Sequence, residues 1–166
     1  MTSWYATVAT PAGPFTVLTD DDQVLASGWT SEVDVLLPLV HPSLRPAESR
    51  STADLGTATK AVLSYLDGDL DAPARILVRQ RGGEFLSHAW QVLREVPPGE
   101  PVTYTGYAAL AGRPAAIRAA AQACARNAAA LYVPCHRVVR VGGALGGFRW
   151  GLPVKRWLLD HESRHP

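Results

Sequence analysis

The stretch LYVPCHRVV, residues 131–139, places a cysteine between a proline and a histidine inside an apolar run. A cysteine thiolate is a nucleophile and a metal ligand, whereas a buried neutral thiol is a small structural residue. Cys135 can therefore be read as a core thiol, a metal ligand or a nucleophile. Taken alone, a core thiol is a credible reading, because free cysteine is among the most buried residue types.

The sequence around Cys135 lacks the companions that a metal site needs. There is no C-x2-C pair, and the adjacent His136 suits no usual zinc-ligand spacing. No ligand pattern is formed by the other histidines, which are His41, His88, His161 and His165. The N-terminal residues show no signal peptide, so we expect a cytoplasmic chain in which Cys135 and the other cysteine, Cys124, stay reduced. We expect neither a metal nor another cofactor.

The neighbours of Cys135 favour a nucleophile. A thiol needs a base or a positive charge nearby to ionise at neutral pH, and His136 and Arg137 follow directly. In an extended chain, adjacent side chains point to opposite faces, so His136 reaches the sulfur only through a turn or a bridging water. Pro134 can set such a turn. Glu162 is a candidate for the group that orients His136.

The charges of the chain are divided between its halves. Residues 1–80 carry 10 acidic and 5 basic side chains, a net charge of −5, and residues 81–166 carry 5 and 11, a net charge of +6. Such a basic half is typical of a surface that faces a polyanion, although a solvated basic face is the alternative. No apolar run approaches the roughly 20 residues that span a bilayer.

The pattern of residues before position 80 predicts a small antiparallel sheet with one helix. Three runs rich in β-branched and aromatic residues, at 4–9, 14–19 and 24–29, are separated by turn residues. Residues 38–50 contain three prolines and are predicted as a loop. An apolar stripe from Ser51 to Gly68 predicts a helix capped by Ser51 or Thr52, and residues 76–78 predict a short strand.

The second half is predicted to be mostly helical. Helices are expected over residues 84–96, 104–111, 114–126 and 153–163, with Thr103 as an N-cap and Gly112 at a helix end. Pro114 suits the first turn of the third of these helices. Helix, short glycine turn and helix form a helix-turn-helix. The alanine-rich helix is slim, which suits either tight packing or a close approach to DNA.

The segment GEPVTYTGYAALAGRPAAIRAAAQACARNAAALYVPCHRVVRVGGALGGFRWGLPVKRWLLDHES resembles the C-terminal domain of the O6-alkylguanine-DNA alkyltransferases. The resemblance implies an α/β (α+β) chain with a ribonuclease H-like N-terminal domain, residues 1–80. A winged-helix-like DNA-binding and alkyl-acceptor domain, residues 81–166, follows. It implies single-turnover transfer of an alkyl group from O6-alkylguanine, or from O4-alkylthymine, in DNA to Cys135. The alternative is a sensor or regulator that binds alkylated DNA without transfer.

The resemblance also implies roles for matched residues. His136 deprotonates Cys135 through a water, Glu162 orients His136, and Asn127 braces the turn before the active-site segment. Tyr104 crowds the 3′ phosphate and donates a proton to guanine, and Arg118 fills the space that the flipped base leaves. The other implied DNA contacts are Thr103, Thr105, Arg113, Ala116 and Ala119. The implied base pocket is formed by Val138, Phe148 and Arg149.

The implied partner is double-stranded DNA, entered through the minor groove by a monomer that binds singly or cooperatively. Several positions depart from the family pattern. Ala128 follows Asn127 where a proline is usual, and Ala130 and Phe148 replace a proline and a tyrosine of the pocket wall. Arg149 and Trp150 stand where some members have small residues. These changes affect how large an alkyl group fits.

Overall fold

The computed structural model describes residues 2–165, whose contacts divide the chain into two compact units of mixed α and β structure. Unit 1 is the chain up to Arg81 together with Ala128–Tyr132. Unit 2 is Gly82–Asn127 together with the chain from Val133 onward. None of the helices within residues 2–165 is long and apolar enough to cross a membrane.

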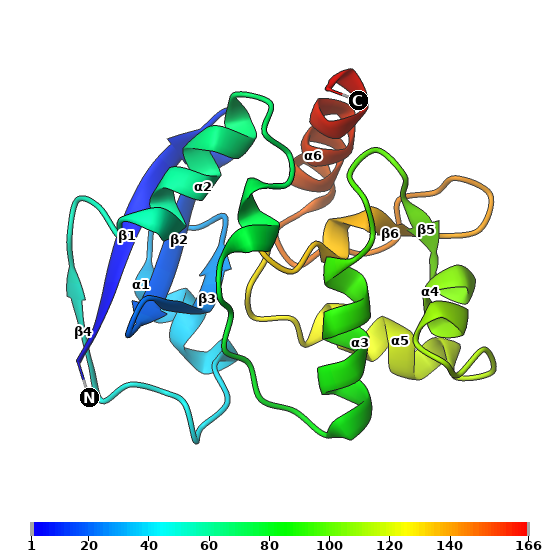
Figure 1. The fold of residues 1–166 in the computed structure, drawn as a ribbon, viewed down its shortest axis with the longest axis horizontal. Coiled ribbons are helices and arrows are strands. Elements are labelled where there is room, and N and C mark those ends of the chain that lie inside the picture. The colour runs from blue at the N-terminus through cyan, green and yellow to red at the C-terminus, as the bar shows by residue number, and fades with distance from the viewer. Residues whose placement is uncertain (1, 166) are drawn as a thin grey trace. The chain divides into compact units, whose positions relative to one another are not determined.

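A four-stranded sheet forms the centre of unit 1 (Figure 1). Its strands are β1 (Thr2–Thr10), β2 (Gly13–Asp20), β3 (Gln23–Gly28) and β4 (Glu48–Ser51), in the order β3-β2-β1-β4. The first three strands are antiparallel, as predicted, but β4 runs parallel to β1. The prediction of a purely antiparallel sheet is therefore wrong at this edge, because a crossover rather than a hairpin leads into β4.

The crossover before β4 contains the short helices α1 (Val33–Leu36) and η1 (Leu37–Leu39). The end of the loop predicted over residues 38–50 is a strand, because β4 begins at Glu48. The following helix, α2 (Thr57–Leu66), starts later than the predicted start at Ser51. Ser51 pairs with β1 instead of capping α2, which begins after Gly56 at a φ of 65°. The 3₁₀ turn η2 (Ala72–Arg75) follows α2, and the strand predicted at 76–78 is reduced to one bridge between Val78 and Val24.

The segment Ala128–Tyr132 belongs to unit 1 through specific hydrogen bonds. The Ser27 amide donates to the Ala128 carbonyl at 2.8 Å, and the Ser27 hydroxyl donates to the Ala130 carbonyl at 2.7 Å. The buried Tyr132 hydroxyl donates to the Ala58 carbonyl of α2 at 2.8 Å. These bonds anchor the chain immediately before the Cys135 turn.

The described part of unit 2 contains four α-helices and one pair of short strands (Figure 1). The helices are α3 (Glu84–Arg94), α4 (Tyr104–Leu110), α5 (Ile117–Ala125) and α6 (Leu152–Arg164). The strands β5 (Val102–Thr103) and β6 (Val138–Val139) pair in parallel. This pairing holds the start of α4 beside the chain that leaves Cys135.

The helices α4 and α5 follow one another in the chain and are separated by residues 111–116. The Thr103 hydroxyl accepts a hydrogen bond from the Gly106 amide at 3.0 Å and caps α4, as predicted. Gly112 has a φ of 83°, which a glycine adopts at little cost at a helix end. The prediction that Pro114 starts the second helix is wrong, because α5 begins only at Ile117 after a separate turn.

One face of α5 packs inside unit 2, so part of its alanine content is explained by packing. Ala120 and Ala123 are fully buried, and the Trp90 indole of α3 donates to the Ala123 carbonyl at 2.8 Å. The Tyr107 hydroxyl of α4 donates to the Ala89 carbonyl at 2.6 Å. Small side chains allow this close approach of the helices, while Arg118 on another face of α5 is exposed.

Candidate active site

Cys135 begins a one-turn 3₁₀ helix, η3 (Cys135–Arg137), immediately after Pro134. The Cys135 amide donates to the Val133 carbonyl at 2.8 Å, and the Arg137 amide donates to the Pro134 carbonyl at 3.0 Å. The chain therefore turns at Pro134, which is the local geometry that a neighbouring base requires.

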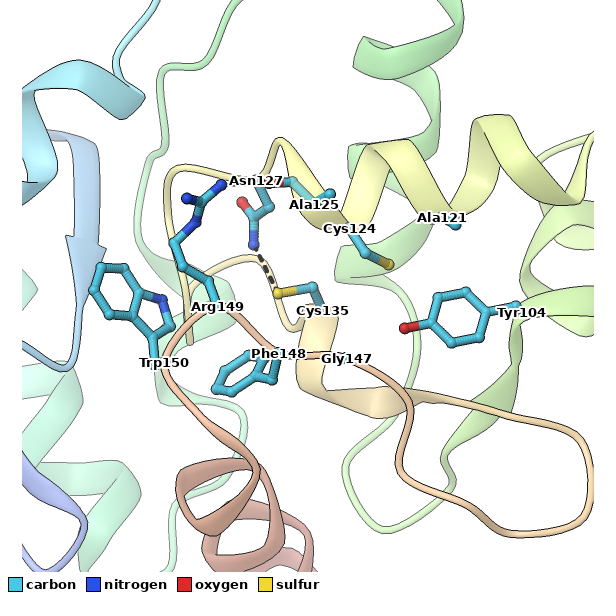
Figure 2. A pocket seen from close by; sticks show the side chains of 10 residues that line it. All are labelled: Tyr104, Ala121, Cys124, Ala125, Asn127, Cys135, Gly147, Phe148, Arg149 and Trp150. Carbon is cyan, nitrogen blue, oxygen red and sulfur yellow. Dashed lines mark hydrogen bonds between the residues drawn. The ribbon is translucent and has the colours of Figure 1, made fainter.

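The Cys135 side chain lines a pocket of about 350 Å³ within unit 2. The other lining residues are Tyr104, Ala121, Cys124, Ala125, Asn127, Gly147, Phe148, Arg149 and Trp150. Figure 2 shows Tyr104 on one side of Cys135 and Arg149 with Trp150 on the other. The pocket thus brings together five of the residues singled out in the sequence: Cys135, Tyr104, Asn127, Phe148 and Arg149.

The side-chain amide of Asn127 connects the end of α5 with the Cys135 turn. Its Nδ2 donates to the Val133 carbonyl at 2.8 Å. It also donates to the Cys135 sulfur at 3.3 Å (Figure 2). Burial raises the pKa of the Cys135 thiol, while the Asn127 hydrogen bond and the charges of Lys155 and Arg149 oppose that rise. The resting thiol is therefore protonated, and its ionisation requires a base.

His136 and Glu162 form a buried pair behind Cys135. The His136 Nε2 lies 2.7 Å from Glu162 Oε2, and both side chains are completely buried. Arg137 donates to both carboxylate oxygens of Glu162, at 2.9 and 3.0 Å, and to the Val96 carbonyl at 2.9 Å. Burial opposes ionisation of Glu162, but the hydrogen bonds from His136 and Arg137 and the positive charge of Arg137 lower the pKa of its carboxyl.

This pairing decides which nitrogen of His136 carries the proton. Burial lowers the pKa of the imidazole, which is therefore neutral. A carboxylate only accepts hydrogen bonds, so Nε2 must carry the proton that is donated to Glu162. The Nδ1 atom is then an unprotonated acceptor, and it is buried without a hydrogen-bond partner in the described part of the protein. Such a nitrogen is suited to act as a general base.

Sequence reasoning missed Lys155. This residue of α6 is completely buried, and its ammonium donates to the Val138 carbonyl at 2.7 Å and to the Gly147 carbonyl at 3.1 Å. The two bonds join β6 to the pocket wall at Gly147 and place a cation close to Cys135. A signal was available, because Lys155, Leu158 and Glu162 follow one another on a single helical stripe.

Tyr104 is held at the pocket by the glycine-rich loop that follows β6. A Cβ on Gly146, whose φ is 75°, would lie 3.0 Å from the Tyr104 ring and 3.1 Å from its hydroxyl. The glycine therefore permits close contact between the loop and the ring. Burial raises the pKa of Tyr104 to about 12, so its hydroxyl keeps its proton at neutral pH.

The remaining predicted residues lie outside the pocket lining. Val138 is buried beneath it, and its carbonyl accepts from Lys155. Thr105 lines a neighbouring groove. The Arg113 guanidinium lies 4.8 Å from the centre of the Phe85 ring. The other predicted DNA contacts lie on α4 and α5 or just before them. Thr103 precedes α4, Ala116 precedes α5, and Arg118 and Ala119 lie on α5.

The described residues 2–165 offer no group of three or more His, Cys, Asp or Glu side chains that could hold a metal ion. The lining of the pocket includes a second cysteine, Cys124, for which the sequence predicted only that it stays reduced. Cys124 lies on α5, and burial raises the pKa of its thiol. Both cysteines are free thiols.

Comparisons with known proteins agree on one family. Residues 84–164 match the family model described as the 6-O-methylguanine DNA methyltransferase, DNA binding domain. A methylated-DNA–protein-cysteine methyltransferase of Salmonella typhimurium is 34% identical over 159 residues, covering 94% of this chain and 93% of that protein. The M. tuberculosis OGT structure in complex with DNA superimposes with a TM-score of 0.79 at 27% identity, covering 98% of this chain and 94% of that one.

Longer relatives contain the same region as one part. The bifunctional transcriptional activator/DNA repair enzyme Ada of Escherichia coli is 41% identical over 122 residues, or 72% of this chain. The regulatory protein ada of Salmonella typhimurium is 48% identical over 136 residues, or 79% of this chain. The matched regions are 34% and 37% of these two proteins, so the chain spans about a third of their length.

Proposed function

Because the chain belongs to the methylated-DNA–protein-cysteine methyltransferase family, we propose that it repairs alkylated DNA by direct reversal, with Cys135 as the acceptor. One observation carries this proposal. The Cys135 sulfur lines a pocket, accepts a hydrogen bond from Asn127, and directly precedes a histidine paired with a buried carboxylate. The substrates are O6-alkylguanine and O4-alkylthymine in double-stranded DNA.

The first step is ionisation of Cys135. His136 Nδ1 is an unprotonated buried acceptor, and a buried acceptor of this kind is ordinarily satisfied by water. We propose that one water accepts the Cys135 proton and passes its own to Nδ1. The Glu162 carboxylate then stabilises the resulting imidazolium, and the Asn127 amide and the Lys155 charge stabilise the thiolate.

The second step is displacement at the alkyl carbon. The sulfur–carbon bond forms, the bond from carbon to guanine O6 breaks, and its electron pair stays on the guanine. Burial raises the pKa of Tyr104 to about 12, so its hydroxyl is protonated at neutral pH and supplies a proton to the departing base. The tyrosinate then regains a proton from the solvent, to which the His136 imidazolium releases one. The thioether is stable, so each protein molecule acts once. The transfer uses only the thiolate and the alkylated base, so no cofactor takes part.

The target carbon lies inside the duplex, so the nucleotide must be rotated into the pocket. We propose that α5 enters the minor groove, with Arg118 in the space that the base leaves and Tyr104 against the 3′ phosphate. Exposure of Arg118 on a helix with a slim alanine surface supports this role. The further contacts with DNA in this proposal are Thr103, Thr105, Arg113, Ala116 and Ala119.

The proposal extends to the finer classification of the fold and to the pocket. We assign residues 1–80 to a ribonuclease H-like domain and residues 81–166 to a winged-helix-like, DNA-binding and alkyl-acceptor domain. The parallel pair β5–β6 beside the helix-turn-helix supports the second assignment. We propose that Phe148 and Arg149 line the base pocket and that Val138 supports it from beneath. We also propose that the protein acts in the cytoplasm as a monomer, alone or cooperatively on DNA.

The experiment is incubation with a duplex oligonucleotide that contains one O6-methylguanine, followed by intact-mass and peptide analysis. We expect a mass increase of one methylene, located on Cys135, and none in Cys135→Ser. The Cys124→Ser variant is the matched control, since it removes the other thiol of the same pocket. Tight binding of the lesion without a mass change would instead identify a sensor.

A further inference from the structure

Arg149 is placed at the rim of the Cys135 pocket by the loop that connects β6 and α6. Its guanidinium Nη2 donates to the carbonyl of Ala125, the last residue of α5. In Figure 2 this side chain stands on the opposite side of Cys135 from Tyr104, next to Trp150. The hydrogen bond keeps the guanidinium near the thiol although the residue is exposed.

The lining of the Cys135 pocket contains a positively charged side chain and no acidic side chain. Arg149 is the one arginine or lysine among the ten lining residues, and none of them is an aspartate or glutamate. A second cation, the Lys155 ammonium, lies behind Gly147. The charges of both residues favour the anionic form of Cys135, so both act at the position of the sulfur. An anionic group that enters this pocket meets no carboxylate in its wall.

From this arrangement we infer that Arg149 is a specificity-determining residue that favours O6 substituents bearing a carboxylate, of which carboxymethyl is the smallest. The inference rests on the proposed alkyl transfer to Cys135. A carboxylate on the substituent repels the attacking thiolate, and this repulsion slows transfer in a neutral pocket. A guanidinium beside the substituent offsets it.

The geometry of the guanidinium suits this task. Arginine has five N–H donors in a planar fork that matches a carboxylate, and the bond to Ala125 engages one nitrogen of Arg149. A substituent attached to guanine O6 must point toward Cys135 for in-line attack. In such an attack the carboxylate, as a substituent of the attacked carbon, lies to the side of the line from sulfur to O6 and so faces the pocket wall, which includes Arg149 and Trp150.

The transfer itself balances as in the methyl reaction. The Cys135 sulfur forms a bond to the methylene carbon, and the bond from that carbon to guanine O6 breaks with its electron pair remaining on the guanine. The guanine regains a proton, and the product carries S-carboxymethylcysteine at position 135. The carboxylate remains ionised throughout, and no oxidant or further reactant is consumed.

The test compares two nearly isosteric lesions, O6-carboxymethylguanine and the neutral O6-carbamoylmethylguanine, in the same duplex. Single-turnover rate constants are measured under excess protein, and intact mass identifies each adduct. We expect the wild type to transfer carboxymethyl about tenfold faster than carbamoylmethyl, as a charge-assisted hydrogen bond allows. Arg149→Gln is expected to lower this ratio to one or below, and added salt is expected to lower it in the wild type.

Because the readout is a ratio within each variant, a general loss of activity cancels. Arg126→Gln is the matched control, since it removes an exposed arginine next to Ala125 that does not line the pocket, and it should keep the wild-type ratio. Arg149→Lys, which keeps the positive charge but not the planar set of donors, should keep part of the wild-type preference for carboxymethyl. A wild-type ratio of one, or a ratio unchanged in Arg149→Gln, would overturn the inference while methyl transfer persists. Absence of transfer from every lesion would overturn the proposed function itself.

Discussion

The His136 Nε2 atom lies 2.7 Å from Glu162 Oε2, with both side chains completely buried. This contact turns an adjacent histidine into an oriented base. The carboxylate accepts a hydrogen bond from the Nε2–H group, so the Nδ1 atom of the neutral ring is unprotonated. Arg137 holds the carboxylate in place through two further hydrogen bonds. Sequence adjacency between Cys135 and His136 would not by itself produce this arrangement.

Replacing Glu162 by glutamine should slow alkyl transfer by roughly a hundredfold, because the imidazolium formed during ionisation of Cys135 loses its carboxylate partner. Stability should fall by about 3–5 kcal/mol, because Arg137 becomes a buried charge without a counter-ion. Single-turnover rates and denaturant unfolding measure both effects. Glu100→Gln, at an exposed site, should change neither. An unchanged rate in Glu162→Gln would remove His136 from the mechanism.

The same carboxylate predicts a pH dependence of stability. Its pKa in the folded protein lies below the unfolded value of 4.5, so between these pKa values the unfolded chain binds more protons. The contribution of Glu162 is therefore fully present above pH 4.5 and is lost as the pH falls toward the folded pKa. The difference in unfolding free energy between wild type and Glu162→Gln should shrink over that acidic range. A difference that is constant down to acidic pH contradicts an ionised Glu162.

Lys155→Met should slow transfer and shift its pH profile. Removing the buried cation raises the pKa of Cys135 further, so the rate should fall at neutral pH and recover in part as the pH is raised. The Val138 and Gly147 carbonyls also lose their donor, at a cost of about 1–3 kcal/mol each if they find no other. Rates measured between neutral and alkaline pH test this. The exposed neighbour Arg156, replaced by glutamine, should leave the profile unshifted.

Gly146→Ala and Gly142→Ala form a matched pair. Both glycines have positive φ values, 75° and 89°, so each alanine costs on the order of 1 kcal/mol in backbone strain. Only at Gly146 would the new Cβ meet Tyr104, at 3.0 Å, whereas nothing lies within 4 Å at Gly142. We expect similar losses of stability but slower transfer in Gly146→Ala alone. Equal transfer rates would show that the position of Tyr104 does not matter.

Arg118→Ala should slow repair in duplex DNA while leaving Cys135 reactive toward a small free-base substrate such as O6-methylguanine. Arg118 is exposed and does not line the pocket, so its loss affects the extrusion of the nucleotide rather than the chemistry. The measurement is the ratio of the rate with duplex to the rate with free base. An equal loss on both substrates contradicts this role.

Some elements could be predicted from local sequence because local physics determines them. The Thr103 cap, the glycine after α4 and the strands formed by runs of β-branched and aromatic residues depend on neighbours within a few residues. The secondary-structure predictions were wrong where pairing with a distant segment overrides the local preference of the residues. Ser51 is a good helix cap by type, but β1 pairs with it as a parallel strand. Residues 76–78 have strand composition, yet only one bridge forms there.

The sequence by itself determined that a cysteine followed by histidine stands in a basic, helical half of the chain, and its motif indicated the family. It also singled out five residues that line one pocket. Only the tertiary structure decided the chemistry of these groups. The pairing of β5 with β6 places Tyr104 near the Cys135 turn, and the packing of α6 buries Glu162 and Lys155 behind it. A pKa and a protonated tautomer depend on what surrounds a group in space, and that surrounding comes from residues tens of positions away.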